Sequence, residues 1–321
     1  HLSGWKNVIE KTYGHKGYYL IAEKGVPNPS NPSNPINPSN PIVGVLPLFH
    51  IKSLLFGNHL VSMPFLNYGG ILSDNEESEM ALLSEAIKLG QKLKVTNTEL
   101  RHLKPISCLN AINPTNSTNP SNSINPTDPT NPINCVTRTH KVRMVLTLPG
   151  SSGELLKSFK AKMRSQISRP QKEGMTAVIG GIELLDPFYK VFSINMRDLG
   201  SPVHSKKIFK QICNEFPQNV KIGIVNCQKI PVSAGLVFCF RDTVEIPWAS
   251  SLKKFNNLSP NMLLYWSLME YACDNGFKYF DFGRSTPGEG TYKFKEQWGA
   301  IPSPLYWHNI SSDGKPLTNN Q

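Results

Sequence analysis

The sequence contains no long apolar run and none of the cysteine or histidine spacings that bind metal ions. Its longest apolar stretch, Ile42 to Ile51, is about half of the roughly 20 residues that a membrane-spanning helix needs, and Pro47 interrupts it. The six cysteines include no C-x-x-C pair and no histidine at a metal-ligand distance. We therefore expect no transmembrane segment, no bound metal, and free buried thiols of the kind found in the reducing cytoplasm.

Acidic residues are almost absent from one segment of the chain. Only 18% of all residues are charged, yet the net charge is +11. Between Arg138 and Lys172 the sequence has nine basic residues and a single acidic one, Glu154. Such a concentration of positive charge suggests an anionic partner, such as a phosphate-bearing donor, a tRNA end or a nucleotide-linked precursor. The candidate anion-binding residues are Lys160, Arg164 and Arg169; a merely solvated helix face is the alternative interpretation.

Two proline-rich repeats interrupt an otherwise globular composition. Residues 27–42 and 112–134 are built on an Asn-Pro-Ser/Thr repeat, which offers almost nothing to bury and removes backbone donors. We interpret them as extended insertions in loops between strands. Without them, the length and the 39% hydrophobic content predict two domains, residues 1–150 and 151–321. Because the chain begins with His1 rather than Met, we also expect the sequence to start inside a longer protein.

The order of periodic segments predicts an α/β protein. In the N-terminal half two strands precede a helix, for which Ser73 and Glu76 fit a capping box and Met80, Leu83 and Ile87 mark an apolar stripe. The C-terminal half starts with a basic helix from about 153 to 169, stopped by Pro170. A strand, two helices and three antiparallel strands follow. A helix capped at Ser259 is apolar nearly all round, which predicts that it is buried.

The segment from Asp281 to Gly299, DFGRSTPGEGTYKFKEQWG, carries the most specific pattern in the chain. A strand ending in Asp-Phe-Gly, then Gly-x-Tyr-x-Phe-Lys and an aromatic residue, resembles the closing motif of FemAB-type aminoacyltransferases. Further stretches resemble the FemAB proteins associated with exosortase and PEP-CTERM loci, namely VLPL (45–48), PFLNYGG (64–70), ELRH (99–102), NMRDLG (195–200) and PWASS (247–251). This resemblance extends over nearly the whole chain apart from the two inserts.

The resemblance implies a fold and an activity. It implies two tandem GNAT-like halves, each a mixed, mostly antiparallel sheet flanked by helices, with a BioF2-like acetyltransferase domain in the second half. It also implies a cytoplasmic bacterial acyltransferase with an amine-bearing acceptor, in cell-wall (peptidoglycan) or exopolysaccharide biosynthesis. The acyl donor would be a co-substrate rather than a bound cofactor, either acetyl-CoA or another acyl-CoA, or aminoacyl-tRNA. The Gln/Arg-x-x-Gly-x-Gly pyrophosphate loop of ordinary GNAT enzymes is not present in clear form.

Acyl transfer to an amine needs positive charge or N–H donors near the carbonyl oxygen and an acceptor for the amine proton. No Ser/His/Asp or Cys/His set is evident, so direct attack in a ternary complex is the simpler mechanism. The predicted catalytic residues are Lys295, Asp281 and Glu289. Lys295 is the motif lysine, Glu289 is a possible base, and Asp281 is either a base or a carboxylate that fixes the local structure.

The predicted substrate-binding residues come from several segments. Positive charge and an aromatic ring near the glycine-rich loop are supplied by Arg284, Lys293 and Tyr292. Trp248 and Ser250 follow a strand and are candidates for the acceptor groove, although a tryptophan there is as often part of the core. Arg101 and His102 end a strand of the N-terminal half. Two other functions remain open: a non-catalytic protein that binds a glycan or nucleotide-linked precursor, and an RNA-binding module suggested by the basic segment alone.

Overall fold

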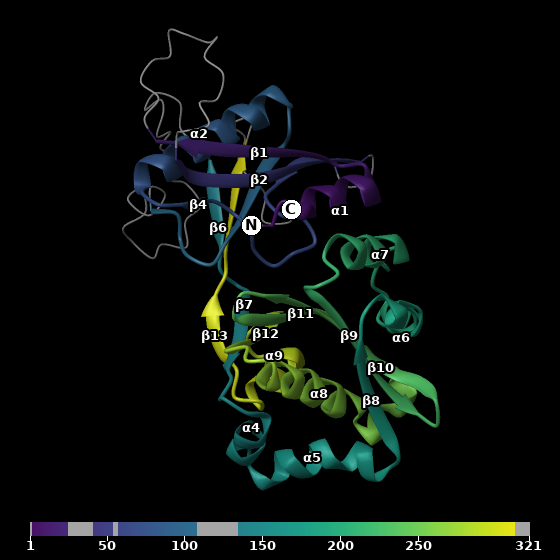
Figure 1. Cartoon of the computed structure of the whole chain (residues 1–321). Helices are drawn as coiled ribbons and strands as arrows, with labels where there is room; N and C mark the ends of the chain where they lie inside the picture. The colour runs from purple at the N-terminus through teal and green to yellow at the C-terminus, as the bar shows by residue number, and fades with distance from the viewer. Residues whose placement is uncertain (1, 25–40, 54–56, 108–133, 312–321) are drawn as a thin grey trace. The chain divides into compact units, whose positions relative to one another are not determined.

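The structure is a computed structural model, and it describes residues 2–24, 41–53, 57–107 and 134–311. The chain forms two compact units. One comprises Gly14–Lys141 and the segment from Pro304 onward, and the other comprises Leu2–Tyr13 and Val142–Ser303. Each unit contains one seven-stranded sheet, flanked by a helix in the first unit and by several in the second, so the predicted α/β class with two helix-flanked sheets is confirmed (Figure 1).

The first unit is a mixed sheet with one long helix on it. Its strands are β1 (Lys16–Glu23), β2 (Ile42–Ser53), β3 (Gly57–Val61), β4 (Leu72–Ser73), β5 (Asn97–His102), β6 (Cys135–Arg138) and β14 (Tyr306–Ser311). They are arranged β1-β2-β3-β5-β14-β6, and β4 pairs with β2. Helix α2 (Glu76–Lys92) lies over β1 and β2 (Figure 1). The core between them consists of leucine, isoleucine, valine and alanine side chains, among them Leu46, Leu48, Leu60, Leu82, Leu83, Ile87 and Leu100.

The N-cap of helix α2 lies two residues later in the sequence than predicted. Asn75, not Ser73, occupies the N-cap, and its side chain accepts a hydrogen bond of 2.8 Å from the backbone N–H of Ser78. Ser73 lies in β4. The predicted capping box was therefore wrong, because asparagine satisfies a free helix N–H as well as serine does. The predicted apolar stripe also fails at Met80, which is 41% exposed, whereas Leu83 and Ile87 are buried.

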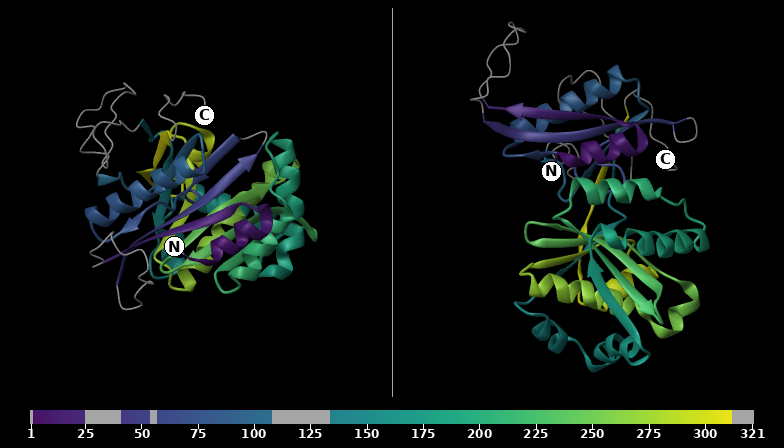
Figure 2. Two further views of the ribbon diagram at one scale, coloured as in Figure 1. Left: turned by 90° about the horizontal axis from the view of Figure 1, so that it is seen from above. Right: turned by 45° about the vertical axis from the view of Figure 1, so that its right-hand side comes forward.

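The second unit has helices on both faces of its sheet. Its strands are β7 (Val142–Thr147), β8 (Met175–Gly180), β9 (Val220–Cys227), β10 (Ile230–Phe240), β11 (Thr243–Ser251), β12 (Tyr279–Ser285) and β13 (Ile301–Pro304), in the order β13-β7-β12-β11-β10-β9-β8. Its α-helices are α1 (Gly4–Tyr13), α4 (Ser152–Ser158), α5 (Ala161–Lys172), α6 (Leu185–Asp198), α7 (Lys206–Glu215), α8 (Pro260–Asp274) and α9 (Gly290–Glu296). Two short 3₁₀ helices span Ile182–Leu184 and Lys253–Leu258. Helices α6 and α7 cover one face, and α8 with α4 and α5 covers the other (Figures 1 and 2).

Helix α8 is buried, as its composition predicts. Nine of its residues are buried, and eight of these belong to the main core of this unit. Pro260 is its first residue, which suits a ring that lacks an N–H group. Ser259 is at the N-cap position, but its side chain makes no capping hydrogen bond. The buried helix therefore gains its stability from packing rather than from its cap.

The basic segment forms two helices, not the single predicted one. Between α4 and α5, Phe159 and Lys160 have extended backbones, with ψ of 146° and 153°. Phe159 is 8% exposed and packs edge-on against Trp266 and Trp298, at 6.3 and 5.5 Å between ring centroids. The buried ring thus lies at the corner between the two helices. Pro170 lies inside α5 and does not stop it.

The packing of the two ends of the chain could not be predicted from the sequence. Helix α1 joins the second unit, where Trp5 contacts Phe216 and Phe238 at ring-centroid distances of 5.2 and 5.5 Å. Strand β14 joins the first unit and pairs with β5 and β6. Each unit is therefore built from segments that are distant in sequence.

The inserted repeats themselves lie largely outside the described residues, but the strands at either end of the first one are described. β1 and β2 are antiparallel, Glu23 pairs with Ile42, and the Lys24 N–H donates to the Pro41 carbonyl at 3.0 Å. We predict that replacing residues 25–40 with a short glycine-containing turn changes the melting temperature by less than about 3 °C, since loop-closure entropy depends weakly on loop length. Calorimetry of the shortened protein tests this. A larger fall would mean that the insert packs against the first unit.

Candidate functional site

Strands β11 and β12 run parallel and then part. They pair through Thr243–Tyr279, Val244–Phe280 and Glu245–Asp281, while β11 continues to Ser251 and β12 to Ser285. Asp281 thus lies where the paired stretch ends. Parting of two neighbouring parallel strands leaves backbone groups at the centre of the sheet available to other partners.

A bulge in β12 directly follows Asp281. Asp281 is opposite Val145 of β7 and Arg284 is opposite Arg143, so Phe282 and Gly283 together face Met144. Gly283 has φ of 71°, a left-handed conformation that costs a glycine nothing and other residues much more. The glycine of the Asp-Phe-Gly motif is therefore needed for the shape of this bulge.

The Asp281 carboxylate holds the bulge in place. It is fully buried, its Oδ1 accepts from the Gly283 N–H at 2.8 Å, and its Oδ2 accepts from Arg143 Nε at 2.5 Å. Both oxygens are thus hydrogen-bonded, one of them to a charged partner. A buried carboxylate is stable only with such compensation. This geometry agrees with a structural role for Asp281.

Lys295 approaches the same bulge from helix α9. Its side chain is 7% exposed, and Nζ donates to the carbonyl oxygens of Gly283 at 3.3 Å and of Arg284 at 2.8 Å. The sequence predicted a loop here, but residues 290–296 form a helix, in which successive side chains are about 100° apart. Lys293 and Lys295 consequently lie on opposite sides, and Lys293 is exposed.

Burial lowers the pKa of Lys295 to about 8. Desolvation of the ammonium is the main cause, and the positive charge of Arg284 acts in the same direction. The negative charges of Asp281 and Glu245 oppose them and favour the ammonium. Lys295 therefore changes its charge close to neutral pH. It belongs to a cluster of charged residues that also contains Arg143, Glu245, Asp281 and Arg284.

The other predicted residues of this loop are more peripheral. Arg284 is exposed on β12, and Glu289 is exposed immediately before α9, without a side-chain capping bond. Tyr292 is half-buried and packs against the main core. Of the predicted set, Lys295, Asp281 and Arg284 are close enough to affect one another electrostatically. The catalytic and binding roles of all these residues remain predictions.

Trp248 and Ser250 face α6 and α7 because β11 also contains a bulge. Glu245 pairs with Phe238 and Trp248 with Leu236, so two residues of β11 lie opposite one of β10 and the alternation of side chains reverses. Trp248 is 9% exposed and packs edge-on against Phe209 at 5.2 Å between ring centroids. Ser250 is buried, and its hydroxyl accepts a hydrogen bond of 3.2 Å from Asn195. A part in an acceptor groove remains a prediction for both.

Arg101 and His102 belong to the first unit. Arg101 binds Glu99, donates to the Leu66 carbonyl at 2.6 Å and stacks on Trp307, with 4.5 Å between the guanidinium carbon and the ring centroid. His102 is buried, and its Nε2 accepts from the Ile71 N–H at 2.8 Å.

Burial lowers the pKa of His102 to about 4, so its ring is neutral at physiological pH. The ring of His308 is 5.3 Å away, and burial lowers its pKa to about 3. A neutral, buried imidazole pair cannot supply positive charge to a substrate. Substrate binding by Arg101 and His102 therefore remains a prediction with little support from their surroundings.

The three predicted anion-binding residues lie near α5 but have different surroundings. Lys160 is exposed at its N-cap, and Arg169 is exposed in its last turn. Arg164 donates through Nη1 to the Phe159 carbonyl at 2.5 Å and so fixes the corner between α4 and α5. Anion binding by this set is still a prediction.

Two charged residues of the cluster, Arg143 and Glu245, were not predicted as site residues from the sequence. Arg143 and Glu245 each stand alone in a strand whose other residues are mainly apolar, and a lone charge inside such a strand was the available signal. Neither could be assigned a partner, because the Arg143–Asp281 pair spans 138 residues.

The described residues contain no group of three or more His, Cys, Asp or Glu side chains suited to a metal ion. Five cysteines lie in the described segments, and all are free; burial raises the pKa of Cys213, Cys239 and Cys273 to about 11, which disfavours reactive thiolates. Within the same segments, no helix combines the length and apolarity required to cross a membrane.

Comparison with known proteins places most of this cluster in a recognised domain, and Arg143 lies before the matched segment. Residues 157–296 match the family model of an acetyltransferase (GNAT) domain, a segment that runs from the end of α4 through α9 and includes Lys295. No functionally curated protein matches the sequence significantly.

Solved structures extend the similarity to the whole fold. The crystal structure of FemX is similar over 95% of this chain and 90% of its own, with a TM-score of 0.66 and 15% identity. L-PGS from Bacillus licheniformis is similar over 86% of this chain and 82% of its own, with a TM-score of 0.55 and 12% identity. A tandem GNAT protein from the clavulanic acid biosynthesis pathway covers 88% and 82%, with a TM-score of 0.52 and 9% identity. These similarities establish a tandem GNAT-type acyltransferase fold.

The buried pair predicts a distinctive result in a double-mutant cycle. Arg143→Met leaves the Asp281 carboxylate buried without its cation, which should lower the free energy of unfolding by about 3–5 kcal/mol. Asp281→Asn removes the charge but keeps an acceptor for the Gly283 N–H. The double variant should therefore lose less stability than Arg143→Met alone. Urea unfolding of the four proteins measures this. A loss below about 1 kcal/mol for Arg143→Met would reduce the pair to an ordinary surface ion pair.

Proposed function

We propose that this protein is a FemAB-like acyltransferase that moves an acyl or aminoacyl group onto an amine. The observation that carries the proposal is the buried, partly desolvated Lys295 ammonium at the bulge of β12, inside a segment that matches a GNAT domain. The FemX-like fold adds support at the level of architecture. A cytoplasmic location is part of the same proposal and rests on the sequence.

The proposed reaction is direct attack in a ternary complex. The amine nitrogen attacks the carbonyl carbon of the donor, and negative charge develops on the carbonyl oxygen. The new C–N bond then replaces the C–O bond of an ester or the C–S bond of a thioester. The amine loses one proton, and the departing alcohol or thiol gains one. In this proposal Lys295 stabilises the developing negative charge, since a donor that is already fixed in place needs no reorganisation.

The remaining roles follow from the surroundings of each carboxylate. Asp281 already accepts two hydrogen bonds, so we assign it to holding the bulge and the charge of Lys295. Glu289 is the predicted base, and Glu289→Gln tests it. Arg284, Lys293 and Tyr292 on the same loop and helix are proposed to bind substrate, with Trp248 and Ser250 toward the acceptor.

The donor and the acceptor are proposed only as classes. The GNAT fold favours an acyl-CoA donor, whereas the FemAB resemblance favours aminoacyl-tRNA, for which the basic Lys160, Arg164 and Arg169 would supply charge. The resemblance to exosortase-associated proteins suggests an amine-bearing precursor of cell wall or exopolysaccharide. Incubating the protein separately with acetyl-CoA and with charged tRNA, and following deacylation with amine acceptors, tests both donors.

One observation favours a second candidate, a non-catalytic binding protein with this fold. The Lys295 ammonium already donates to two backbone carbonyls, which is what a purely structural lysine does. Saturable binding of a precursor without release of CoA or tRNA would identify that function.

Substitution of Lys295 distinguishes the acyltransferase from the non-catalytic binding protein. Lys295→Ala should lower turnover by about 10²–10³-fold if the ammonium stabilises the transition state. Some thermal stability should also be lost, because two hydrogen bonds disappear. Lys278→Ala, at an exposed lysine between α8 and β12 for which no role in substrate binding is proposed, is the control and should keep full turnover. A folded Lys295→Ala protein with near-normal turnover, judged by circular dichroism and steady-state transfer, would remove Lys295 from the mechanism.

The lowered pKa of Lys295 predicts the pH dependence. With a pKa of about 8, the ammonium predominates below pH 8 and is lost above it. The ratio of kcat/KM between the parent and Lys295→Arg should therefore fall by up to about tenfold per pH unit above 8, since arginine stays charged. Using this ratio cancels the ionisation of the acceptor amine. A ratio that rises through pH 8 would instead mean that the neutral amine of Lys295 acts as a base.

A further inference from the structure

A cavity of about 880 Å³ lies in the second unit. It is an open cavity lined by the end of β7, by α4 and α5, and by the end of α9, and its volume is in the range of small-molecule sites. Its walls are mostly apolar, formed by Leu146, Leu148, Leu155, Phe159, Met163 and Trp298. None of the predicted catalytic residues lines it.

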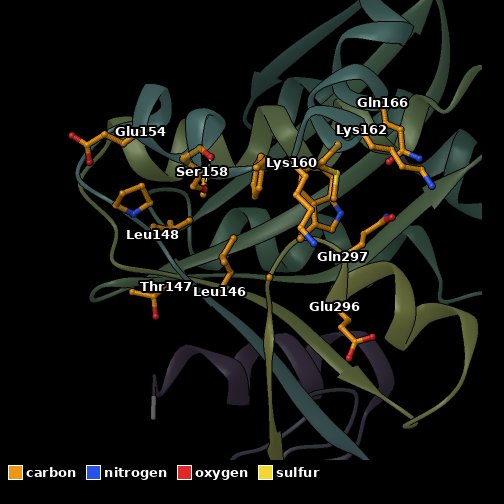
Figure 3. Close-up of a pocket in the computed structure, with 16 residues that line it drawn as sticks. Leu146, Thr147, Leu148, Glu154, Ser158, Lys160, Lys162, Gln166, Glu296 and Gln297 are labelled. Atoms are coloured by element: carbon orange, nitrogen blue, oxygen red, sulfur yellow. Dashed lines mark hydrogen bonds between the residues drawn. The ribbon is translucent and has the colours of Figure 1, made fainter.

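The polar groups of the cavity are distributed unevenly. Lys160, Lys162, Gln166, Gln297 and the carboxylate of Glu296 lie toward one side, and Glu154 lies at the opposite end (Figure 3). Lys160 is also the N-cap of α5, a twelve-residue helix whose N-terminus has no side-chain cap. The positive end of the helix dipole and two lysines thus face the same end of the cavity, a combination that favours an anion.

A second observation points to an occupant. Trp298 lines the cavity, is 1% exposed, and its Nε1 is buried with no hydrogen-bond partner in the described part of the chain. Its ring packs against Phe159, at 5.5 Å between centroids, and Phe159 directly precedes Lys160. The wall of the cavity therefore holds one unused indole donor, from which an oxygen-bearing group of an occupant would accept.

The aromatic walls indicate what the body of the occupant is. Phe159 and Trp298 are almost fully buried and engaged edge-to-face with each other, and Phe159 also contacts Trp266. Stacking on a nucleobase requires an exposed ring face, which these rings do not offer. The leucine and methionine walls suit an aliphatic chain instead. We infer that this cavity binds an anionic amphiphile, an aliphatic chain that carries a phosphate or carboxylate head, with the head at Lys160 and Lys162.

The inference is independent of the proposed function and is tested by binding alone. Decyl phosphate is titrated into the full chain while the indole N–H signals of its five tryptophans are followed by NMR. Trp298→Phe identifies the Trp298 signal. We expect that signal to shift saturably with decyl phosphate. Ethyl phosphate should bind at least about a hundredfold more weakly, because it lacks the buried methylenes, and decanol should bind more weakly because it lacks the charge.

Two double variants with equal loss of charge complete the test. Lys160→Gln/Lys162→Gln should weaken binding of decyl phosphate at least tenfold. Lys157→Gln/Lys172→Gln changes exposed lysines of the same two helices that do not line the cavity, and should leave binding unchanged. No shift of the Trp298 signal up to about 1 mM decyl phosphate, or equal weakening in both double variants, would overturn the inference.

Co-sedimentation with lipid vesicles distinguishes a bilayer lipid from a free amphiphile as the ligand. If the parent sediments with phosphatidylglycerol vesicles and Lys160→Gln/Lys162→Gln does not, the head group is that of a bilayer lipid. If neither sediments while decyl phosphate still binds, the ligand is a free amphiphile.

Discussion

A buried carboxylate at the centre of the second sheet is the constraint on which the candidate site depends. Asp281 is fully inaccessible, and its charge is tolerable only because Arg143 and the Gly283 N–H both bind it. Satisfying those two partners requires the β12 backbone to bulge after Asp281, and the bulge turns the carbonyls of Gly283 and Arg284 toward Lys295. One electrostatic requirement thus fixes a strand, a glycine and a lysine together.

The lysine is then held between opposing influences. Burial and Arg284 favour its neutral form, while Asp281 and Glu245 favour the ammonium, and the balance brings its pKa to about 8. A group with such a pKa is costly to maintain in a protein interior. Groups of this kind are concentrated at functional sites, although structural networks also contain them. This lysine lies within the segment that matches a GNAT domain, and its catalytic role is the one proposed above.

The cavity beside α4 and α5 gives the basic segment a more specific interpretation than its charge alone allowed. The sequence grouped Lys160, Arg164 and Arg169 as one anion-binding set. In the folded chain Arg164 is bound to the Phe159 carbonyl, whereas Lys160 borders the cavity together with Lys162. The extended residues Phe159 and Lys160 separate the two helices beside this cavity.

Local patterns were sufficient for much of the fold. The apolar composition of residues 260–274 required a buried helix, alternation and β-branched residues marked most strands, and the Asp-Phe-Gly and Gly-x-Tyr-x-Phe-Lys motif located Lys295. These features depend on neighbours within a few residues, and the sequence determines them directly. The motif was an exception to this rule. Its glycines suggested a loop, whereas residues 290–296 form helix α9.

Tertiary structure alone decided which charges meet. Arg143 and Asp281 are 138 residues apart, and β14 returns to pair between β5 and β6. Of the two motif lysines, only Lys295 is buried, because α9 turns it toward β12 and turns Lys293 to solvent. Pairings of this kind depend on which strands become neighbours and on which face of a helix packs inward. The free energy that selects them comes from burial across the whole unit, which no local stretch of sequence encodes.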